Sequence, residues 1–285
     1  MQKQKKRCNA TTAQIESYAT HLQEQEKSTA TIQKYVYNLT AFFLWLDGRE
    51  LTKIALIEWK GYLTEQYAPA SVNSMLATVN GFLSYLDLQS LSVKPLKIQK
   101  ALFSDGTKEL TREEYYRLVR AAEQDGNQRL ALLIQTICAI GIRVSELKFI
   151  TVEAVHTGRA EVSNKGKRRM VFLPGKLCSM LKRYLKHHGI TTGPVFVTRS
   201  GTPLNRSNIW RDMKALCESS GVEPGKVFPH NLRHLFARTY YAVEKDLSRL
   251  ADILGHSNVA TTRIYTMESG VTHARQLEHL GLIFT

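Results

Sequence analysis

The stretch LQSLSVKPLKIQKALFSDGT at residues 88–107 constrains the fold most, because it interrupts an otherwise helical pattern. It holds Pro95, which lacks a backbone N–H donor, together with Gly106 and three lysines. Such a break between two periodic regions is typical of a linker. A chain of 285 residues is also long enough for two domains, each with its own core. We therefore predict a first domain at 1–90, a linker at 91–107 and a second domain at 108–285.

The first domain is predicted to be helical throughout. Apolar residues recur at helical spacing from Ile32 to Leu46, which places one apolar stripe along a long helix. Ser28 or Thr29 is the expected N-cap of this helix, and Asp47-Gly48 is its expected end. Further helices are expected over 11–25, 52–65 and 71–86.

Polar side chains remain on the outer faces of these helices and in the linker. Amides, hydroxyls and ammonium groups of this kind can donate to DNA phosphates or to base edges. For each of them an ordinary solvated face is the alternative interpretation. The candidates for DNA contact are Thr31, Lys34, Asn38, Asn73, Asn80, Lys94 and Lys97.

The second domain is predicted to open at a capping box formed by Thr111 and Glu114. Helices should follow over 111–125 and 128–140. Two short strands are expected at 161–163 and 170–173, around the turn signal Asn-Lys-Gly-Lys at 164–167. A further turn is expected near 199–202, and the chain is predicted to be helical again from 205. The expected fold class is mainly α with a small β-sheet (α+β).

Charge points to a polyanionic partner. The chain has 39 Lys and Arg against 25 Asp and Glu, a formal net charge of +14, which favours nucleic acid. The four cysteines form no CxxC pattern, as expected of a reduced, cytoplasmic protein. The longest apolar run, 130–142, is shorter than the ~20 residues that a membrane span needs. The basic N-terminus has no apolar segment after it, so a secretory signal is not expected.

Several chemistries are disfavoured by the motifs. Each Gly-Lys pair lacks a following Ser or Thr, so no Walker-type phosphate loop is expected. Carboxylates do not cluster as a two-metal nuclease requires. His230 and His234 have the spacing of a zinc helix, but Arg233 stands between them and no Glu accompanies them. We expect neither a metal nor another cofactor.

A tyrosine and a set of basic residues remain, and they suit attack of a tyrosine hydroxyl on a phosphodiester. Two guanidiniums can stabilise the negative charge of the pentacoordinate transition state. A phenol with a pKa of ~10 needs a base or nearby cations, and the departing 5′ oxygen needs an acid. The residues concerned are Arg143, Lys165, His230, Arg233, His256 and Tyr265.

Four segments resemble the successive motifs of the tyrosine recombinases, the phage-integrase-type enzymes. They are GIRVSEL at 141–147, SNKGKRRMVFLP at 163–174, HNLRHLFA at 230–237 and LGHSNVATTRIYT at 254–266. Thr-Ile-x-x-Tyr at 31–35 resembles part of the core-DNA-binding domain of that family. The length is similar to that of the two-domain Xer-type members.

The resemblance implies a role for each residue. Arg143 and Arg233 would bind the scissile phosphate, and Tyr265 would be the nucleophile that forms a 3′-phosphotyrosyl bond. His230 would be the general base or a proton relay, and His256 would donate to a phosphate oxygen. Lys165 would be the general acid. Lys167 is the second candidate for that acid. Lys167 and Arg168 are also candidates for DNA contact. Glu146 would orient the arginine motif.

The resemblance also implies the partner and the assembly. The partner would be double-stranded DNA with paired inverted half-sites, bound by a homotetramer, or by a mixed complex with a related recombinase, without ATP. The output would be integration, excision, inversion or resolution, in the nucleoid-associated part of the cytoplasm. The tail at 267–285 would dock on a neighbouring protomer or pack on its own domain. The alternatives are a type IB topoisomerase-like enzyme that relaxes DNA and a non-catalytic DNA-binding protein.

Overall fold

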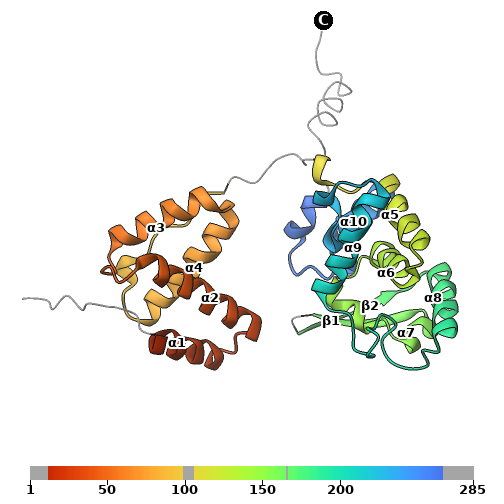
Figure 1. Cartoon of the computed structure of the whole chain (residues 1–285), viewed down its shortest axis with the longest axis horizontal. Coiled ribbons are helices and arrows are strands. Elements are labelled where there is room, and N and C mark those ends of the chain that lie inside the picture. The colour runs from red at the N-terminus through yellow and green to blue at the C-terminus, as the bar shows by residue number, and fades with distance from the viewer. Residues whose placement is uncertain (1–11, 99–105, 165, 266–285) are drawn as a thin grey trace, which may run out of the picture. The chain divides into compact units, whose positions relative to one another are not determined.

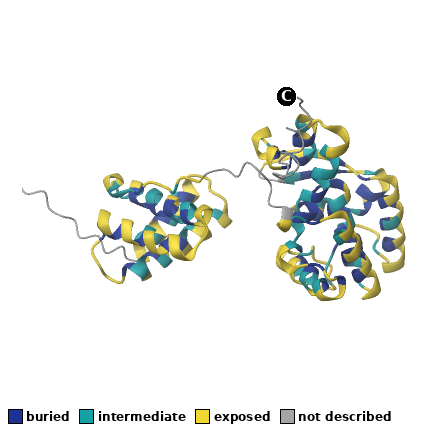
Figure 2. Ribbon diagram, turned by 90° about the horizontal axis from the view of Figure 1, so that it is seen from above, coloured by how far each residue is buried: buried dark blue, intermediate teal, exposed yellow. Residues whose placement is uncertain are grey.

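The computed structural model describes residues 12–98, 106–164 and 166–265. The chain divides into two compact units, one before residue 101 and one from residue 101 onward (Figure 1). Each unit has its own buried interior, with exposed residues on its outer surface (Figure 2). Within the described ranges, no helix combines the length and the apolar character that crossing a bilayer would require.

The first unit is a bundle of four helices, as predicted. They are α1 (Thr12–Glu24), α2 (Thr29–Leu46), α3 (Lys53–Gln66) and α4 (Pro69–Tyr85). The Ser28 side chain caps α2, as predicted, and Thr52 caps α3. Helix α4 begins two residues earlier than predicted, because proline is well tolerated in the first turn of a helix. Phe42 of α2 packs against Trp59 of α3 with a centroid distance of 4.7 Å, at the centre of the core.

The segment from 88 to 98 belongs to the first unit, although residues from 91 onward are predicted to be linker. After the short 3-10 turn η1 (Gln89–Leu91), Val93 is buried and Leu96 packs against the same core. The Asn80 amide donates to the Val93 carbonyl at 2.8 Å and accepts from its N–H at 3.1 Å. Asn73 makes the equivalent pair with Leu96, at 2.9 and 2.7 Å.

Three of the asparagines predicted to contact DNA have hydrogen-bond partners within the first unit, and their contact with DNA stays a prediction. The amides of Asn73 and Asn80 are occupied by the backbone of the docked segment. Asn38 is buried and donates to the Thr78 hydroxyl at 3.1 Å. Asn38 is buried and needs a partner within the protein, whereas Asn73 and Asn80 are partly exposed and use their amides to hold the docked segment.

The other candidates for DNA contact in this unit differ in their surroundings. The Thr31 hydroxyl lies 2.9 Å from the Ser28 hydroxyl, within the cap of α2. Lys34, Lys94 and Lys97 are exposed. Their contact with DNA stays a prediction.

The substitution Asn80→Ala is expected to lower the free energy of unfolding of the first unit by about 1–3 kcal/mol, because two backbone groups of Val93 lose their partner. Urea unfolding of the full chain, followed by tryptophan fluorescence, measures this loss. Lys34→Ala is the control: this exposed residue should leave the unfolding midpoint unchanged while weakening DNA binding. An unchanged midpoint for Asn80→Ala would contradict the docking role.

The second unit is mainly helical and carries the two-stranded sheet. Its helices are α5 (Arg112–Gln124), α6 (Gln128–Ile140), α7 (Val152–Thr157), α8 (Gly175–His188), α9 (Arg206–Ser220), α10 (Pro229–Glu244) and α11 (Leu247–Leu254). Thr111 and Glu114 form the predicted capping box. The predicted helices α5 and α6 are confirmed, whereas α7 and α8 were not anticipated.

The predicted hairpin is confirmed and is longer than expected. Strands β1 (Arg159–Asn164) and β2 (Lys167–Phe172) pair antiparallel, with Asn164 opposite Lys167. Helix α6 is the centre of this unit and packs against α5, α8 and α10. Its apolar residues face neighbours on most sides, which explains the long apolar run in the sequence.

Candidate active site

The C-terminal end of α6 places Arg143. The helix stops at Gly141, which has a positive φ of 63°. A Cβ atom there would lie 2.3 Å from the ring of Phe236, so the site requires glycine for space as well as for conformation. Ile142 is buried, and Arg143 then starts the 3-10 turn η3 (Val144–Phe149), with its side chain 30% exposed.

Arg233 links three parts of the site from a buried position on α10. One terminal nitrogen donates to the Gly141 carbonyl and the other to the Leu254 carbonyl, both at 2.7 Å. The second nitrogen also lies 3.0 Å from Nε2 of His256. Burial, reinforced by the nearby charge of Arg143, lowers the pKa of Arg233 to about 10. The guanidinium therefore stays charged at neutral pH and joins the ends of α6 and α11.

His256 follows the left-handed cap of α11 at Gly255. Its Nδ1 lies 2.9 Å from the hydroxyl of Thr262, which is buried. Since Nε2 faces an N–H of Arg233, we assign the proton of the neutral ring to Nδ1, which donates to Thr262. Burial and the charges of Arg233 and Arg143 lower the pKa of His256 to about 4.

Tyr265 lies beside these groups at the end of the 3-10 segment η5 (Val259–Tyr265), and it is buried. Its ring stacks on His256 at a centroid distance of 6.1 Å and meets His234 edge to face at 4.9 Å. Burial raises the pKa of the phenol, although Arg233 and Arg143 act in the opposite direction. The hydroxyl is therefore protonated at neutral pH and needs a base to become a nucleophile.

His230 lies in the first turn of α10, exposed to solvent. Its ring centroid is 4.5 Å from that of His234. Partial desolvation, followed by the charges of Arg233 and Arg143, lowers the pKa of His230. A neutral imidazole at this position can accept a proton.

The start of β2 lies beside the residue that follows His256. Lys165 is outside the described residues. Lys167, the second lysine of the hairpin, is exposed, and its Nζ lies 2.5 Å from the hydroxyl of Ser257. Arg168 is also exposed and pairs loosely with Glu161 at 3.6 Å.

Two basic hollows flank Arg143, which alone among the described residues lines both. One hollow runs past the hairpin and the loop after α11, and the other runs past α10 and the start of α9. The first is lined by Lys167, Arg168, Arg169, His256, Ser257 and Asn258, among others. The second is lined by Lys148, Asn205, Arg206, Trp210, His230 and Arg233, among others. The five described catalytic candidates are therefore brought together around this one region, with Tyr265 in contact with His256.

Several neighbours of the site were missed from the sequence. Arg169 contacts Glu146 and the end of α11, and His234 packs on Tyr265. Arg206 and the half-exposed Trp210 line the second hollow. Strand alternation was a usable signal for Arg169, because it shares the inward face of β2 with the buried Val171. No comparable local pattern indicated the others.

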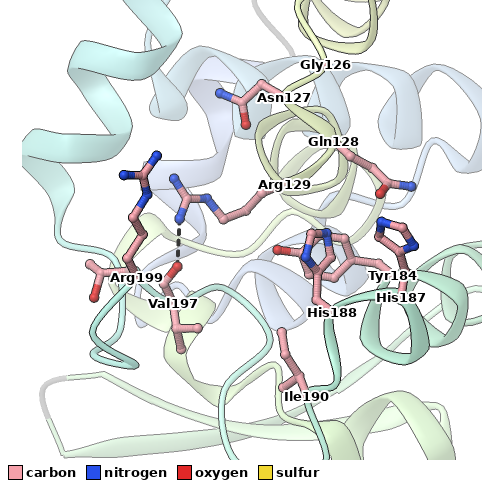
Figure 3. Close-up of a pocket in the computed structure, with 11 residues that line it drawn as sticks. Gly126, Asn127, Gln128, Arg129, Tyr184, His187, His188, Ile190, Val197 and Arg199 are labelled. Carbon is pink, nitrogen blue, oxygen red and sulfur yellow. Dashed lines mark hydrogen bonds between the residues drawn. The ribbon is translucent and has the colours of Figure 1, made fainter.

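A further basic hollow lies between the start of α6, the end of α8 and residues 197–199 (Figure 3). Arg129 donates there to the Val197 carbonyl at 2.8 Å, and Arg199 and two histidines of α8 also line it. None of the five described catalytic candidates lines this hollow. It is therefore separate from the candidate active site.

Comparison with known proteins agrees with this arrangement. The phage integrase family matches residues 108–270, and the N-terminal SAM-like domain of phage integrases matches 15–89. Tyrosine recombinase XerA of Thermococcus kodakarensis is 29% identical over 274 residues, covering 93% of each chain. Tyrosine recombinase XerD of Lacticaseibacillus casei is 30% identical over 269 residues, covering 85% of this chain and 89% of the relative.

Solved structures share the fold. XerH site-specific recombinase bound to its difH substrate superposes with a TM-score of 0.71 at 20% identity, covering 96% of this chain and 85% of XerH. A lambda integrase dimer bound to a core site has a TM-score of 0.74 at 17% identity, covering 91% of this chain and 96% of the integrase chain. The family match spans more than half of the sequence, including the region that holds the candidate site. The chain therefore belongs to the phage integrase family, the tyrosine recombinases.

Proposed function

We propose that the protein is a site-specific DNA recombinase that cleaves and rejoins strands through a 3′-phosphotyrosyl intermediate, without metal or ATP. The observation that carries this proposal is the position of Tyr265, beside His256 and close to Arg233. A nucleophile, two guanidiniums and two imidazoles at one place are what strand transfer at a phosphodiester requires. The covalent bond conserves the energy of the broken phosphodiester, so resealing needs no nucleotide.

An unpaired donor on Arg233 supports phosphate binding at this place. Its Nε is buried and has no hydrogen-bond partner within the described part of the chain. A buried N–H without a partner is costly, and a phosphate oxygen would satisfy it. Arg143, which is partly exposed to the hollows, would bind the same phosphate from the other side.

The protonation states of Tyr265 and the nearby histidines indicate which group takes the proton and which gives one. Tyr265 is protonated at neutral pH, and the neutral ring of His230 would take its proton, directly or through His234. Lys165 would protonate the departing 5′ oxygen, and Lys167 is the second candidate. His256 would donate to a phosphate oxygen from Nε2, which requires its proton to move from Nδ1 to Nε2 and its contact with Arg233 to be released.

We further propose that the protein acts as a tetramer on two DNA sites, each with paired inverted half-sites. A lambda integrase of the same fold has been solved as a tetramer bound to a Holliday junction. The tail at 267–285, which lies outside the described residues, would dock on a neighbouring protomer. Such a protein would be found with the nucleoid in the cytoplasm.

A nicked duplex tests the proposal. The duplex carries an inverted repeat selected by the protein itself from a random-sequence pool, and the incubation contains EDTA. We expect a covalent protein–DNA adduct that survives denaturing electrophoresis and is attached to the 3′ end. A strict metal requirement would overturn the mechanism. Relaxation of supercoiled plasmids that lack the selected site would instead favour a topoisomerase.

A further inference from the structure

Glu146 is a buried carboxylate that binds two arginines at once. Arg169, on the inward face of β2, donates from its two terminal nitrogens to both carboxylate oxygens, at 2.8 and 2.9 Å. Arg143 donates to the same carboxylate from its backbone N–H at 2.8 Å and from its guanidinium at 3.1 Å. The Glu146 side chain is fully buried, so little solvent screens these contacts.

The net charge of Arg143, Glu146 and Arg169 together decides how strongly Arg143 can attract a phosphate. Arg143 and Glu146 alone would form a neutral pair, and the buried carboxylate would oppose binding of an anion beside it. Arg169 supplies a second positive charge, and its side chain is less exposed than that of Arg143, 13% against 30%. We propose that Arg169 is a positioning residue that neutralises Glu146 and thereby leaves the charge of Arg143 available to the scissile phosphate. This inference rests on the proposed function.

The state of Glu146 agrees with this assignment. Burial by itself would raise the pKa of the Glu146 carboxyl, but the hydrogen bonds and charges of Arg169 and Arg143 bring it below its ordinary value. The carboxylate is therefore ionised at neutral pH, and its charge must be balanced. The bidentate contact from Arg169 is the geometry best suited to that balance.

Arg169 also connects the hairpin to His256. Its Nε donates to the Ile253 carbonyl at 2.9 Å, near the end of α11. A Cβ atom at Gly255 would come within 3.0 Å of the Arg169 side chain, so the two pack closely. A purely mechanical support of this turn is the competing explanation, and it predicts a different response to removal of the Glu146 charge.

A double-mutant cycle separates the two explanations. We expect Arg169→Met to slow single-turnover cleavage of the nicked duplex by about 100-fold, comparable to loss of one preorganised donor. The double variant Arg169→Met with Glu146→Gln should cleave at least about tenfold faster than Arg169→Met alone, because no buried charge then opposes Arg143. A double variant as slow as Arg169→Met, or slower, would overturn the proposal. Arg211→Met, an exposed arginine of α9, is the matched control and should cleave normally.

Urea unfolding would reveal whether Arg169→Met folds. If it does not fold, two further measurements still test the proposal. Arg169→Lys retains the charge and loses the bidentate contact, so it should stay within about tenfold of the parent rate; a loss as large as that of Arg233→Met would overturn the proposal. A methylphosphonate at the scissile position removes the phosphate charge and should shrink the defect of any Arg169 variant. An undiminished defect would also overturn it. If the parent protein forms no adduct, the proposed function fails; if only the variant pattern is absent, this inference alone fails.

Discussion

Replacing Tyr265 by phenylalanine is expected to abolish the covalent protein–DNA adduct while DNA affinity stays unchanged. The substitution removes one oxygen atom and keeps the ring, which stacks on His256 and meets His234 edge to face. The buried position should therefore remain filled, and the fold should survive. Denaturing electrophoresis of a nicked-duplex reaction measures the adduct, and fluorescence anisotropy measures binding.

Tyr240→Phe is the matched control for this loss. Tyr240 also lies in the second unit, on α10, where its ring packs near Phe236. The same atom is removed there, and the adduct should form normally. An adduct that persists in Tyr265→Phe would show that another residue is the nucleophile.

Replacing Arg233 by methionine is expected to lower the cleavage rate by about 10²–10³ and to destabilise the second unit as well. The rate falls because a guanidinium with a free buried Nε–H is lost from the phosphate site. Stability falls because the carbonyls of Gly141 and Leu254 lose their donor, at a cost of about 1–3 kcal/mol each. Single-turnover cleavage and urea unfolding measure the two effects separately.

Arg238→Met isolates the catalytic part of this effect. Arg238 lies on the same helix, pairs with Glu109 and donates to the Leu110 carbonyl at 2.7 Å. Its loss should lower stability without slowing cleavage by folded protein. Equal rates for the folded Arg233 and Arg238 variants would remove Arg233 from the chemistry.

Local signals in the sequence predicted much of the fold. Ser28 caps α2, and Thr111 with Glu114 opens α5, because a cap is decided by a side chain and a backbone N–H three residues apart. The hairpin followed from the turn residues at its tip. The types and order of the catalytic candidates were recognisable for the same reason: each lies in a short motif of adjacent residues.

Contacts between distant segments were not predictable in this way. Asn73 and Asn80 look like polar surface residues, but they bind a segment that follows them by 23 and 13 positions. Helix α8 was not predicted, although its buried residues Leu177, Leu181 and Leu185 recur at helical spacing, so a local signal for this helix was present in the sequence. Arg169 and Glu146 are 23 positions apart, and neither residue type predicts the other as its partner.

The amino-acid sequence by itself determined most of the helices, where several of them begin and which family the chain resembles, since these depend on side chains a few positions apart. Only the tertiary structure decided that Arg233 joins Gly141, 92 positions away, to Leu254, and that Glu146 lies between two arginines. The physical reason is that such pairs depend on how the helices around α6 pack, because burial leaves each carbonyl, carboxylate and guanidinium with few possible partners.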